Sequence, residues 1–162
     1  MKILMKILKL TILLITLMVS RVAVADITGY ALVVDGDTIT IEGTKVRLHG
    51  IDTPESEQMC ERNGVKWECG YEVAEILKRW LKAKEVRCMG DTHDIYGRLI
   101  ADCFVDGYNV NARLVYEGLA LAYRKYSDRY VAEEIQARIA GRGLWSGDFI
   151  MPWEWRRGKR LE

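Results

Sequence analysis

The charge and length of this 162-residue chain argue against nucleic-acid binding through bulk charge and against a second domain. Its formal net charge is +1. Without the first 25 residues, which hold four basic and no acidic side chains, 20 basic residues face 23 acidic ones, a net charge of −3. Proteins that hold nucleic acid through bulk charge are strongly basic, so any such function must come from a local site. The remaining 137 residues suffice for one domain and are too few for two.

The first 25 residues have the three-part layout of a secretory signal peptide. Three lysines precede an apolar run at 10–19, and Ala23-Val24-Ala25 closes the segment as an A-x-A cleavage pattern. An uncleaved membrane anchor is the alternative, but this run is shorter than the roughly 20 residues that span a bilayer. We expect cleavage after Ala25, export to the periplasm or beyond the cell, and no stable membrane association afterwards.

Three segments after the leader have the composition or alternation of β-strands: 27–34, 37–42 and 45–51. The first two are rich in β-branched and aromatic residues and meet at Asp35-Gly36, a strong hairpin signal. The third strand ends at the D-T-P of residues 52–54. The stretch 55–70 is polar and turn-rich, so a loop is expected there.

Four cysteines are present: Cys60, Cys69, Cys88 and Cys103. They have no C-x-x-C spacing and the two histidines, His49 and His93, are isolated, so disulfides are favoured over a zinc site. Three pairings are possible. Nearby partners close with the least loss of chain entropy, which favours Cys60–Cys69 together with Cys88–Cys103 across a hairpin.

The chain after residue 70 contains both helical and strand-like segments. The expected elements are a helix over 71–84, strands at 85–89 and 99–105, and helices over 109–117 and 128–140. In the last helix we expect Asp128 to be the N-cap and Val131, Ile135 and Ile139 to form the apolar face. This order of elements predicts a small β-barrel with helices packed outside it, an α+β fold that is mostly β.

The C-terminal tail, residues 151–162, is rich in tryptophan and arginine. We expect Trp145, Trp153 and Trp155 to pack on the body of the domain. The basic residues of the tail are expected to stay solvated: Arg156, Arg157, Lys159 and Arg160.

Acidic residues stand at the ends of the first strands. Asp37 begins one strand and Asp52 ends another, with Glu55 shortly after it. If these strand ends are neighbours, three carboxylates meet, which is costly unless a cation lies among them. Oxygen ligands favour a hard ion such as calcium or magnesium. Arg47 and Arg98 add forked phosphate-binding groups, so the pattern suits phosphodiester hydrolysis.

Three motifs in order, VDGDT (34–38), VRLHGIDTPE (46–55) and DIYGR (94–98), resemble the thermonuclease family, the staphylococcal nuclease-like domains. The resemblance runs from about 28 to 145 and includes VNARLVYEGLA (110–120). It implies a five-stranded OB-fold barrel with about three packed α-helices, for which we take the bounds 26–150. It also implies calcium-dependent hydrolysis of DNA and RNA to 3′-phosphate products. A domain of this size is expected to be a monomer.

The resemblance also implies roles for single residues. Asp37 and Asp52 match the calcium carboxylates, and Thr53 matches the residue whose carbonyl joins them. Glu55 matches the carboxylate that positions or deprotonates the attacking water. The remaining matches are the phosphate-binding arginines Arg47 and Arg98, Tyr96 near the far phosphate, and the candidate base-stacking residues Tyr123 and Tyr126. Ile95 departs from the best-known member, which has a phosphate-binding lysine there.

Two alternatives belong to other functional classes. One is a catalytically inactive OB-fold module that binds a ligand without cutting it, which fold-level analogy allows. Such members are recognised by losses among the site's acids and arginines, and none is lost here. The other is an extracellular interaction domain that docks a partner or an anionic surface through residues 151–162.

Overall fold

The computed structural model describes residues 25–161. The expected signal peptide lies outside these residues, apart from Ala25. Among the helices of the described part, none is both long and apolar enough to cross a membrane.

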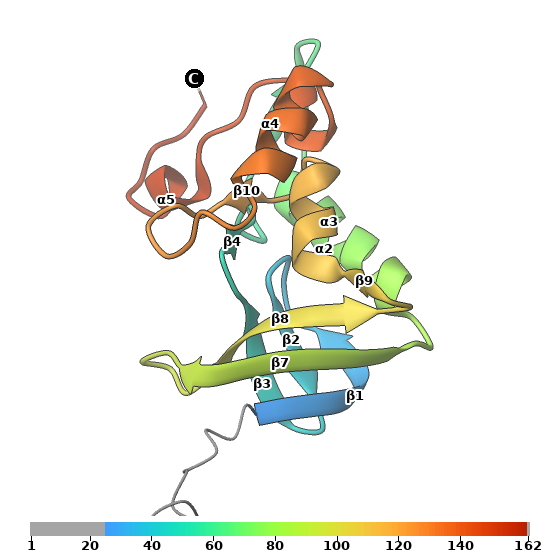
Figure 1. Ribbon diagram of the computed structural model, residues 1–162. Helices are drawn as coiled ribbons and strands as arrows, with labels where there is room; N and C mark the ends of the chain where they lie inside the picture. Colours follow the sequence, from blue (N-terminus) through green and yellow to red (C-terminus); the bar gives the residue numbers. More distant parts are fainter. Residues whose placement is uncertain (1–24, 162) are drawn as a thin grey trace, which may run out of the picture.

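Five strands of the described chain close into a barrel (Figure 1). They are β1 (Ala25–Val33), β2 (Thr38–Ile41), β3 (Thr44–Leu48), β7 (Glu85–His93) and β8 (Leu99–Val105). Neighbours run antiparallel in the order β3-β2-β1-β7-β8, and a parallel pairing of β3 with β8 closes the sheet. Alternating residues such as Ile39, Ile41, Val46 and Leu48 fill the interior, as the period of two requires. The predicted OB-type barrel is therefore confirmed.

Shorter strands lie outside the barrel: β4 (Ile51–Asp52), β5 (Cys60–Arg62), β6 (Val65–Trp67), β9 (Tyr108–Asn109) and β10 (Leu121–Ala122). β4 pairs with β10, which fixes the position of Asp52 relative to the segment that follows residue 122. β5 and β6 form a hairpin. The expectation of an irregular loop over 55–70 was wrong at this point, because Asn63 and Gly64 adopt the positive φ angles that a tight hairpin turn needs.

Within the described residues, two buried disulfides fasten the fold. Cys60–Cys69 joins β5 to the start of the following helix, with Cα atoms 5.6 Å apart. Cys88–Cys103 joins directly opposed residues of β7 and β8, with Cα atoms 4.0 Å apart. This is the pairing that the sequence favoured.

The helices gather at one end of the barrel (Figure 1). They are α2 (Cys69–Leu81), α3 (Val110–Tyr116), α4 (Val131–Ile139), α5 (Pro152–Trp155) and the 3₁₀ helix η1 (Gly143–Ser146). α2 buries Val73, Leu77 and Leu81, which lie on one face of the helix. Asn109 caps α3 by accepting a hydrogen bond from the backbone N of Ala112 at 2.9 Å.

The prediction for α4 was wrong in two respects. The helix begins at Val131 rather than at Asp128. Ile135 and Ile139 are 50% and 83% exposed, whereas Glu134 is buried. The Glu134 carboxylate accepts hydrogen bonds from the backbone N of Ala122 (2.9 Å) and from Arg124 (2.6 Å). The face of α4 that packs inward therefore holds Val131, Glu134 and Ala137, and the Glu134 carboxylate satisfies a backbone donor of β10.

The C-terminal tail returns to the body of the domain. Trp145 packs edge-on against Phe149, and Trp153 stacks on Tyr123 with ring centroids 5.6 Å apart. The expected packing of these two tryptophans is therefore present. Arg156 is exposed, as expected, but its guanidinium also binds Asp52 and Glu55, which the sequence did not indicate. Arg157, Lys159 and Arg160 are exposed.

Candidate active site

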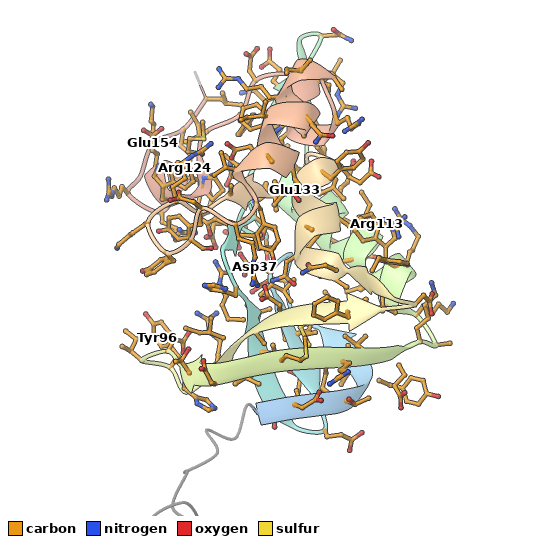
Figure 2. The ribbon with its side chains drawn as sticks, in the orientation of Figure 1. Asp37, Tyr96, Arg113, Arg124, Glu133 and Glu154 are labelled. Atoms are coloured by element: carbon orange, nitrogen blue, oxygen red, sulfur yellow. A yellow bond between two sulfur atoms is a disulfide. The ribbon has the colours of Figure 1, made fainter. Side chains whose placement is uncertain are left out.

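A cavity of about 800 Å³ lies where the barrel rim meets the helices and the tail. Figure 2 places Asp37 at this junction and Tyr96 on the turn between β7 and β8. The sequence-predicted residues that line the cavity are Asp37, Arg47, Thr53, Glu55, Tyr96, Arg98, Tyr123 and Tyr126. Asp52 lies directly behind them, fully buried and paired with Arg47. The structure thus brings all nine together.

The turn from β1 to β2 sets the position of Asp37. Asp35 accepts a hydrogen bond from the backbone N of Asp37 at 3.0 Å, which makes it a turn residue. A Cβ at Gly36 would lie 2.6 Å from Thr53 Oγ1, so glycine permits the turn to pack on Thr53. One carboxylate oxygen of Asp37 consequently accepts from both the backbone N (3.2 Å) and the hydroxyl (3.1 Å) of Thr53.

Arg47 joins the two buried aspartates. Thr38 of β2 faces Arg47 of β3 in the antiparallel register, which puts the arginine beside Asp37. Its guanidinium forms ion pairs with Asp37 and with Asp52, the latter at 3.1 Å. Burial lowers the pKa of Arg47, but an arginine begins from so high a value that it stays charged. The Asp37 and Asp52 carboxylates therefore converge on one cation.

The turn between β7 and β8 orients Arg98. Asp94 accepts hydrogen bonds from the backbone N of Tyr96 and of Arg98, at 2.9 and 3.0 Å, and from Arg98 Nε at 2.7 Å. Burial raises the pKa of Asp94, but these hydrogen bonds outweigh it and hold the pKa below its ordinary value. Arg98 Nη1 also donates to the hydroxyl of Thr38 at 3.2 Å. Sequence reasoning missed Asp94, although its place in DIYGR was a visible signal.

Glu55 lies on the loop after β4 and is held by its backbone. Its N–H donates to the side chain of the fully buried Gln58 at 3.2 Å. A Cβ at Gly70, the second residue of α2, would overlap with the Glu55 carbonyl oxygen. The glycine therefore lets the start of the helix support this loop, and Glu55 lines the cavity.

Arg156 is a functional candidate that sequence reasoning missed. Its Nη1 donates to Asp52 (3.1 Å) and to Glu55 (2.5 Å), and its Nη2 donates to the second oxygen of Asp52 (2.7 Å). Burial alone would lower the pKa of Arg156, but the hydrogen bonds to Asp52 and Glu55 raise it above its ordinary value. Nothing local in the sequence separates Arg156 from Arg157.

The donor set suits a hard divalent cation. The oxygens of Asp37, Asp52 and Glu55 and the carbonyl of Thr53 are the ligand types that calcium and magnesium prefer. Across residues 25–161, no group of three or more His, Cys, Asp or Glu side chains stands ready to hold a metal ion. Arg47 forms ion pairs with Asp37 and Asp52, and Arg156 forms ion pairs with Asp52 and Glu55. The residues fit such an ion by the chemistry of their oxygen donors.

The aromatic residues form a separate wall. Tyr123 stacks face to face on Trp153, with an interplanar angle of 5°. Tyr126 contacts Tyr123 edge-on, with centroids 4.9 Å apart, and is largely exposed. Tyr96 is also exposed, and the Arg98 guanidinium lies 5.4 Å from its ring centre. Exposed rings such as those of Tyr96 and Tyr126 are of the type that can stack on nucleobases.

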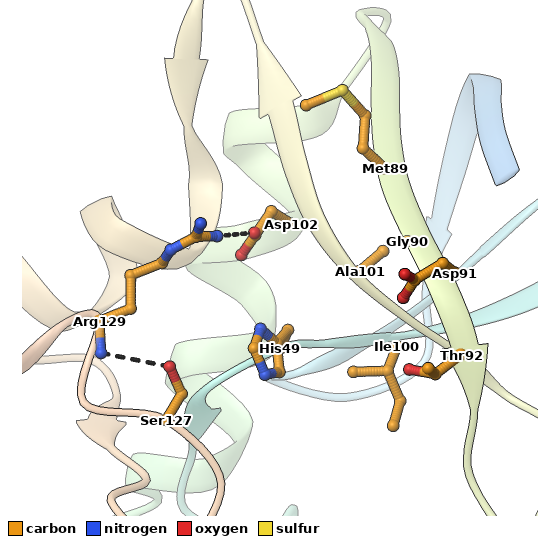
Figure 3. Close-up of a pocket in the computed structure, with 10 residues that line it drawn as sticks. All are labelled: His49, Met89, Gly90, Asp91, Thr92, Ile100, Ala101, Asp102, Ser127 and Arg129. Atoms are coloured by element: carbon orange, nitrogen blue, oxygen red, sulfur yellow. Dashed lines mark hydrogen bonds and ion pairs between the residues drawn. The ribbon is translucent and has the colours of Figure 1, made fainter. Parts of the chain in front are cut away.

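A smaller cavity of about 440 Å³ adjoins the first (Figure 3). Arg129 forms an ion pair with Asp102 across it, and the hydroxyl of Tyr130 donates to the same carboxylate at 2.6 Å. The backbone N of Arg129 donates to the hydroxyl of Ser127 at 3.2 Å. These charged groups satisfy one another, so we assign no chemistry to this cavity.

A five-stranded OB-type barrel with acids and arginines at one rim is the arrangement expected of a staphylococcal nuclease-like domain. Residues 45–147 match the family described as "Staphylococcal nuclease homologue", and the chain belongs to that family. It is 38% identical over 128 residues to the succinoglycan biosynthesis protein ExoI of Rhizobium meliloti (strain 1021), which covers 76% of this chain and 66% of that protein.

Two further relatives carry nuclease names. The micrococcal nuclease of Shigella flexneri is 33% identical over 165 residues, covering 90% of each chain. An uncharacterized endonuclease of Haemophilus influenzae (strain ATCC 51907 / DSM 11121 / KW20 / Rd) is 32% identical over 135 residues, covering 78% of this chain and 71% of the relative. The chain spans just under two thirds of the Rhizobium protein and little more than a third of the plant staphylococcal-like nucleases that it resembles.

Proposed function

We propose that this protein is a calcium-dependent nuclease that hydrolyses phosphodiester bonds of DNA and RNA to 3′-phosphate products. The observation that carries the proposal is the convergence of acids and arginines on one cavity. Asp37, Thr53 and Glu55 line it together with Arg47 and Arg98, and Asp52 lies behind them. Family membership and the nuclease names of relatives support the same reaction class.

The chain's own residues divide the chemistry among them. Asp37 and Asp52 with the carbonyl of Thr53 would hold the calcium ion, which when bound supplies positive charge to a phosphoryl oxygen. Glu55 accepts a proton from the attacking water, as a general base at the cavity wall. Arg47 and Arg98 hold the phosphate through their forked donors and stabilise the charge that develops on its oxygens.

The substrate is nucleic acid read with little sequence preference. Tyr123 and Tyr126 offer stacking faces, and Tyr96 stands at the far side of Arg98 for a neighbouring phosphate. Stacking does not distinguish one base from another strongly. The chain without its leader has a net charge of −3, so we expect weak, salt-sensitive capture of substrate.

The setting we propose is the periplasm or the extracellular space. The two disulfides persist in oxidising compartments, which agrees with a leader over residues 1–25. The nuclease domain would then comprise 26–150, with 151–162 as its tail, in a monomer without stable membrane association.

Cleavage of single- and double-stranded DNA and RNA by residues 26–162 tests the proposal. The reactions contain calcium, magnesium or a chelator, and Glu55→Gln is the matched control because it keeps the shape of the side chain and removes the base. We expect calcium-specific cutting that the control loses. A folded, disulfide-intact chain that does not cut would instead point to a binding module.

A further inference from the structure

Positive charge gathers in two segments of the chain, 123–127 after β10 and 153–160 in the tail, the second of them beyond the family match that ends at residue 147. Together they hold one acidic and six basic side chains. The remainder of residues 26–162 holds 22 acidic and 14 basic ones. We call the six the basic surface: Arg124, Lys125, Arg156, Arg157, Lys159 and Arg160. A chain that is acidic elsewhere thus carries a local basic field here.

The two segments lie side by side at the wall of the larger cavity. Tyr123 stacks on Trp153 with ring centroids 5.6 Å apart, which joins one segment to the other. Figure 2 labels one residue of each, Arg124 and Glu154, on the same side of the molecule. Tyr123 and Arg156 also line the cavity. A polymer that leaves the cavity on this side therefore runs onto the basic surface.

The last three basic residues of the tail, Arg157, Lys159 and Arg160, are exposed. Lys159 pairs with Glu154 at 3.0 Å, but an exposed pair of this kind contributes little and does not prevent contact with a phosphate. The Arg160 guanidinium lies 4.0 Å from the ring centre of Trp155, and its Nη1 donates to the carbonyls of Trp155 and Lys159 at 2.8 and 2.7 Å. These contacts orient Arg160 while its other N–H groups stay available to a ligand.

We propose that Arg157, Lys159 and Arg160 bind backbone phosphates of a nucleic-acid strand outside the cavity, so that the enzyme prefers long strands to short ones. This inference rests on the proposed nuclease function. Each phosphate that a basic side chain neutralises releases counterions, which favours binding. A basic path beside exposed aromatic rings such as Tyr126 suits a single strand. A membrane surface is also anionic, but a surface continuous with the cavity favours a strand that occupies both.

Binding without cleavage tests the proposal. The probe is a fluorescein-labelled thymidine oligonucleotide of about 12 residues, within the range that one OB fold accommodates. Its anisotropy is measured with residues 26–162 in a chelator at several salt concentrations. The tail variant is Arg157→Ala/Lys159→Ala/Arg160→Ala. The control, Lys78→Ala/Arg79→Ala/Lys82→Ala, removes the same charge from exposed positions in and just after α2 that do not line the cavity.

We expect the tail variant to lower the slope of log affinity against log salt by about two, since each of three single-strand phosphate contacts contributes about 0.7. If the two affinities meet near 1 M salt, binding at about 0.1 M salt falls by about 10- to 100-fold. The control should weaken binding less than threefold. Equal losses in the two variants would assign the effect to bulk charge and overturn the proposal.

Two further measurements separate the remaining explanations. Arg157→Lys/Arg160→Lys keeps the charge, so it should keep most of the salt slope, and its loss would overturn phosphate contact by the tail. Vesicles of phosphatidylglycerol replace the oligonucleotide in a second assay. A tail variant that loses vesicle binding and keeps oligonucleotide binding would overturn the proposal in favour of a membrane surface.

Cleavage distinguishes this inference from the function on which it rests. With calcium present, the ratio of kcat/KM for the long oligonucleotide to kcat/KM for a dinucleotide should fall by about tenfold or more in the tail variant, through KM. A wild-type chain that cuts, with an unchanged ratio and salt slope in the tail variant, refutes the inference alone. A wild-type chain that binds through the tail and does not cut refutes the proposed nuclease function.

Discussion

Substituting Gly36 with alanine tests how closely the fold and the site depend on one turn. The backbone at Gly36 does not adopt the left-handed conformation, so the cost of a side chain is steric. The added Cβ would lie 2.6 Å from Thr53 Oγ1, 2.8 Å from Thr53 Cβ and 2.9 Å from Val73 Cγ1. Separations below 3.0 Å force a shift, and Thr53 and Val73 are both buried.

We expect Gly36→Ala to destabilise the protein by about 1–3 kcal/mol, the usual cost of overpacking a filled interior. Thr53 must move, and it donates twice to Asp37, so cleavage should fall by about 10- to 100-fold, as a displacement near 1 Å causes. Denaturant unfolding and nucleic-acid cleavage measure the two effects.

Gly43→Ala is the matched control. Gly43 has a φ of +79° and open space around a Cβ, so alanine costs backbone strain of about 1 kcal/mol without touching the site. We expect this variant to lose stability and keep its activity. Wild-type stability and wild-type cleavage in Gly36→Ala would refute the claim that the close packing of this turn positions Asp37 and Thr53.

Two other predictions concern the turn at Asp94 and the barrel disulfide. Asp94→Asn removes the carboxylate that holds Arg98, so kcat/KM should fall by about tenfold. The pKa of Asp94 is lowered by folding, so its stabilising contribution is complete above its ordinary pKa and is lost as the pH falls through the folded value. The stability difference between wild type and Asp94→Asn should therefore shrink in acid, and a difference constant with pH would contradict this. Replacing Cys88 and Cys103 with serine opens a 15-residue loop and should cost about 3 kcal/mol in denaturant unfolding, whereas an unchanged midpoint would exclude a stabilising role.

Strand periodicity and turn chemistry predicted the first strands, and the order of elements predicted a β-barrel, whereas its five-stranded OB type came from the family resemblance. Ile39 and Ile41, like Val46 and Leu48, alternate with polar residues, and this alternation determines which face is buried whatever the partner strand is. Asp35-Gly36 predicted the turn between the first two strands, because Asp-Gly is a local hairpin signal that does not depend on the rest of the fold. The predictions failed at α4, where the hydrophobic spacing of Ile135 and Ile139 competed with the need of a backbone N–H of β10 for the Glu134 carboxylate.

In the candidate site, too, contacts between residues close in sequence could be predicted and contacts between distant residues could not. Arg47 lies beside Asp37 because adjacent strands pair Thr38 with Arg47, a relation that can be inferred from a hairpin. Asp94 and Arg98 belong to one turn and are four residues apart. The proximity of such residues can be predicted from the sequence, because a short segment of chain fixes their geometry.

Arg156 could not be placed in this way, since it contacts Asp52 across 104 residues of chain and Glu55 across 101. Its position depends on a series of side-chain contacts, from Gln58 to Ile150 and from Tyr123 to Trp153, and none of them has a periodicity in the sequence. An arginine in a Trp- and Arg-rich tail has the same local pattern whether its guanidinium is free in solvent or paired with acids. The tail of this chain is therefore interpretable only in three dimensions, where its guanidinium joins two carboxylates that the proposed reaction needs.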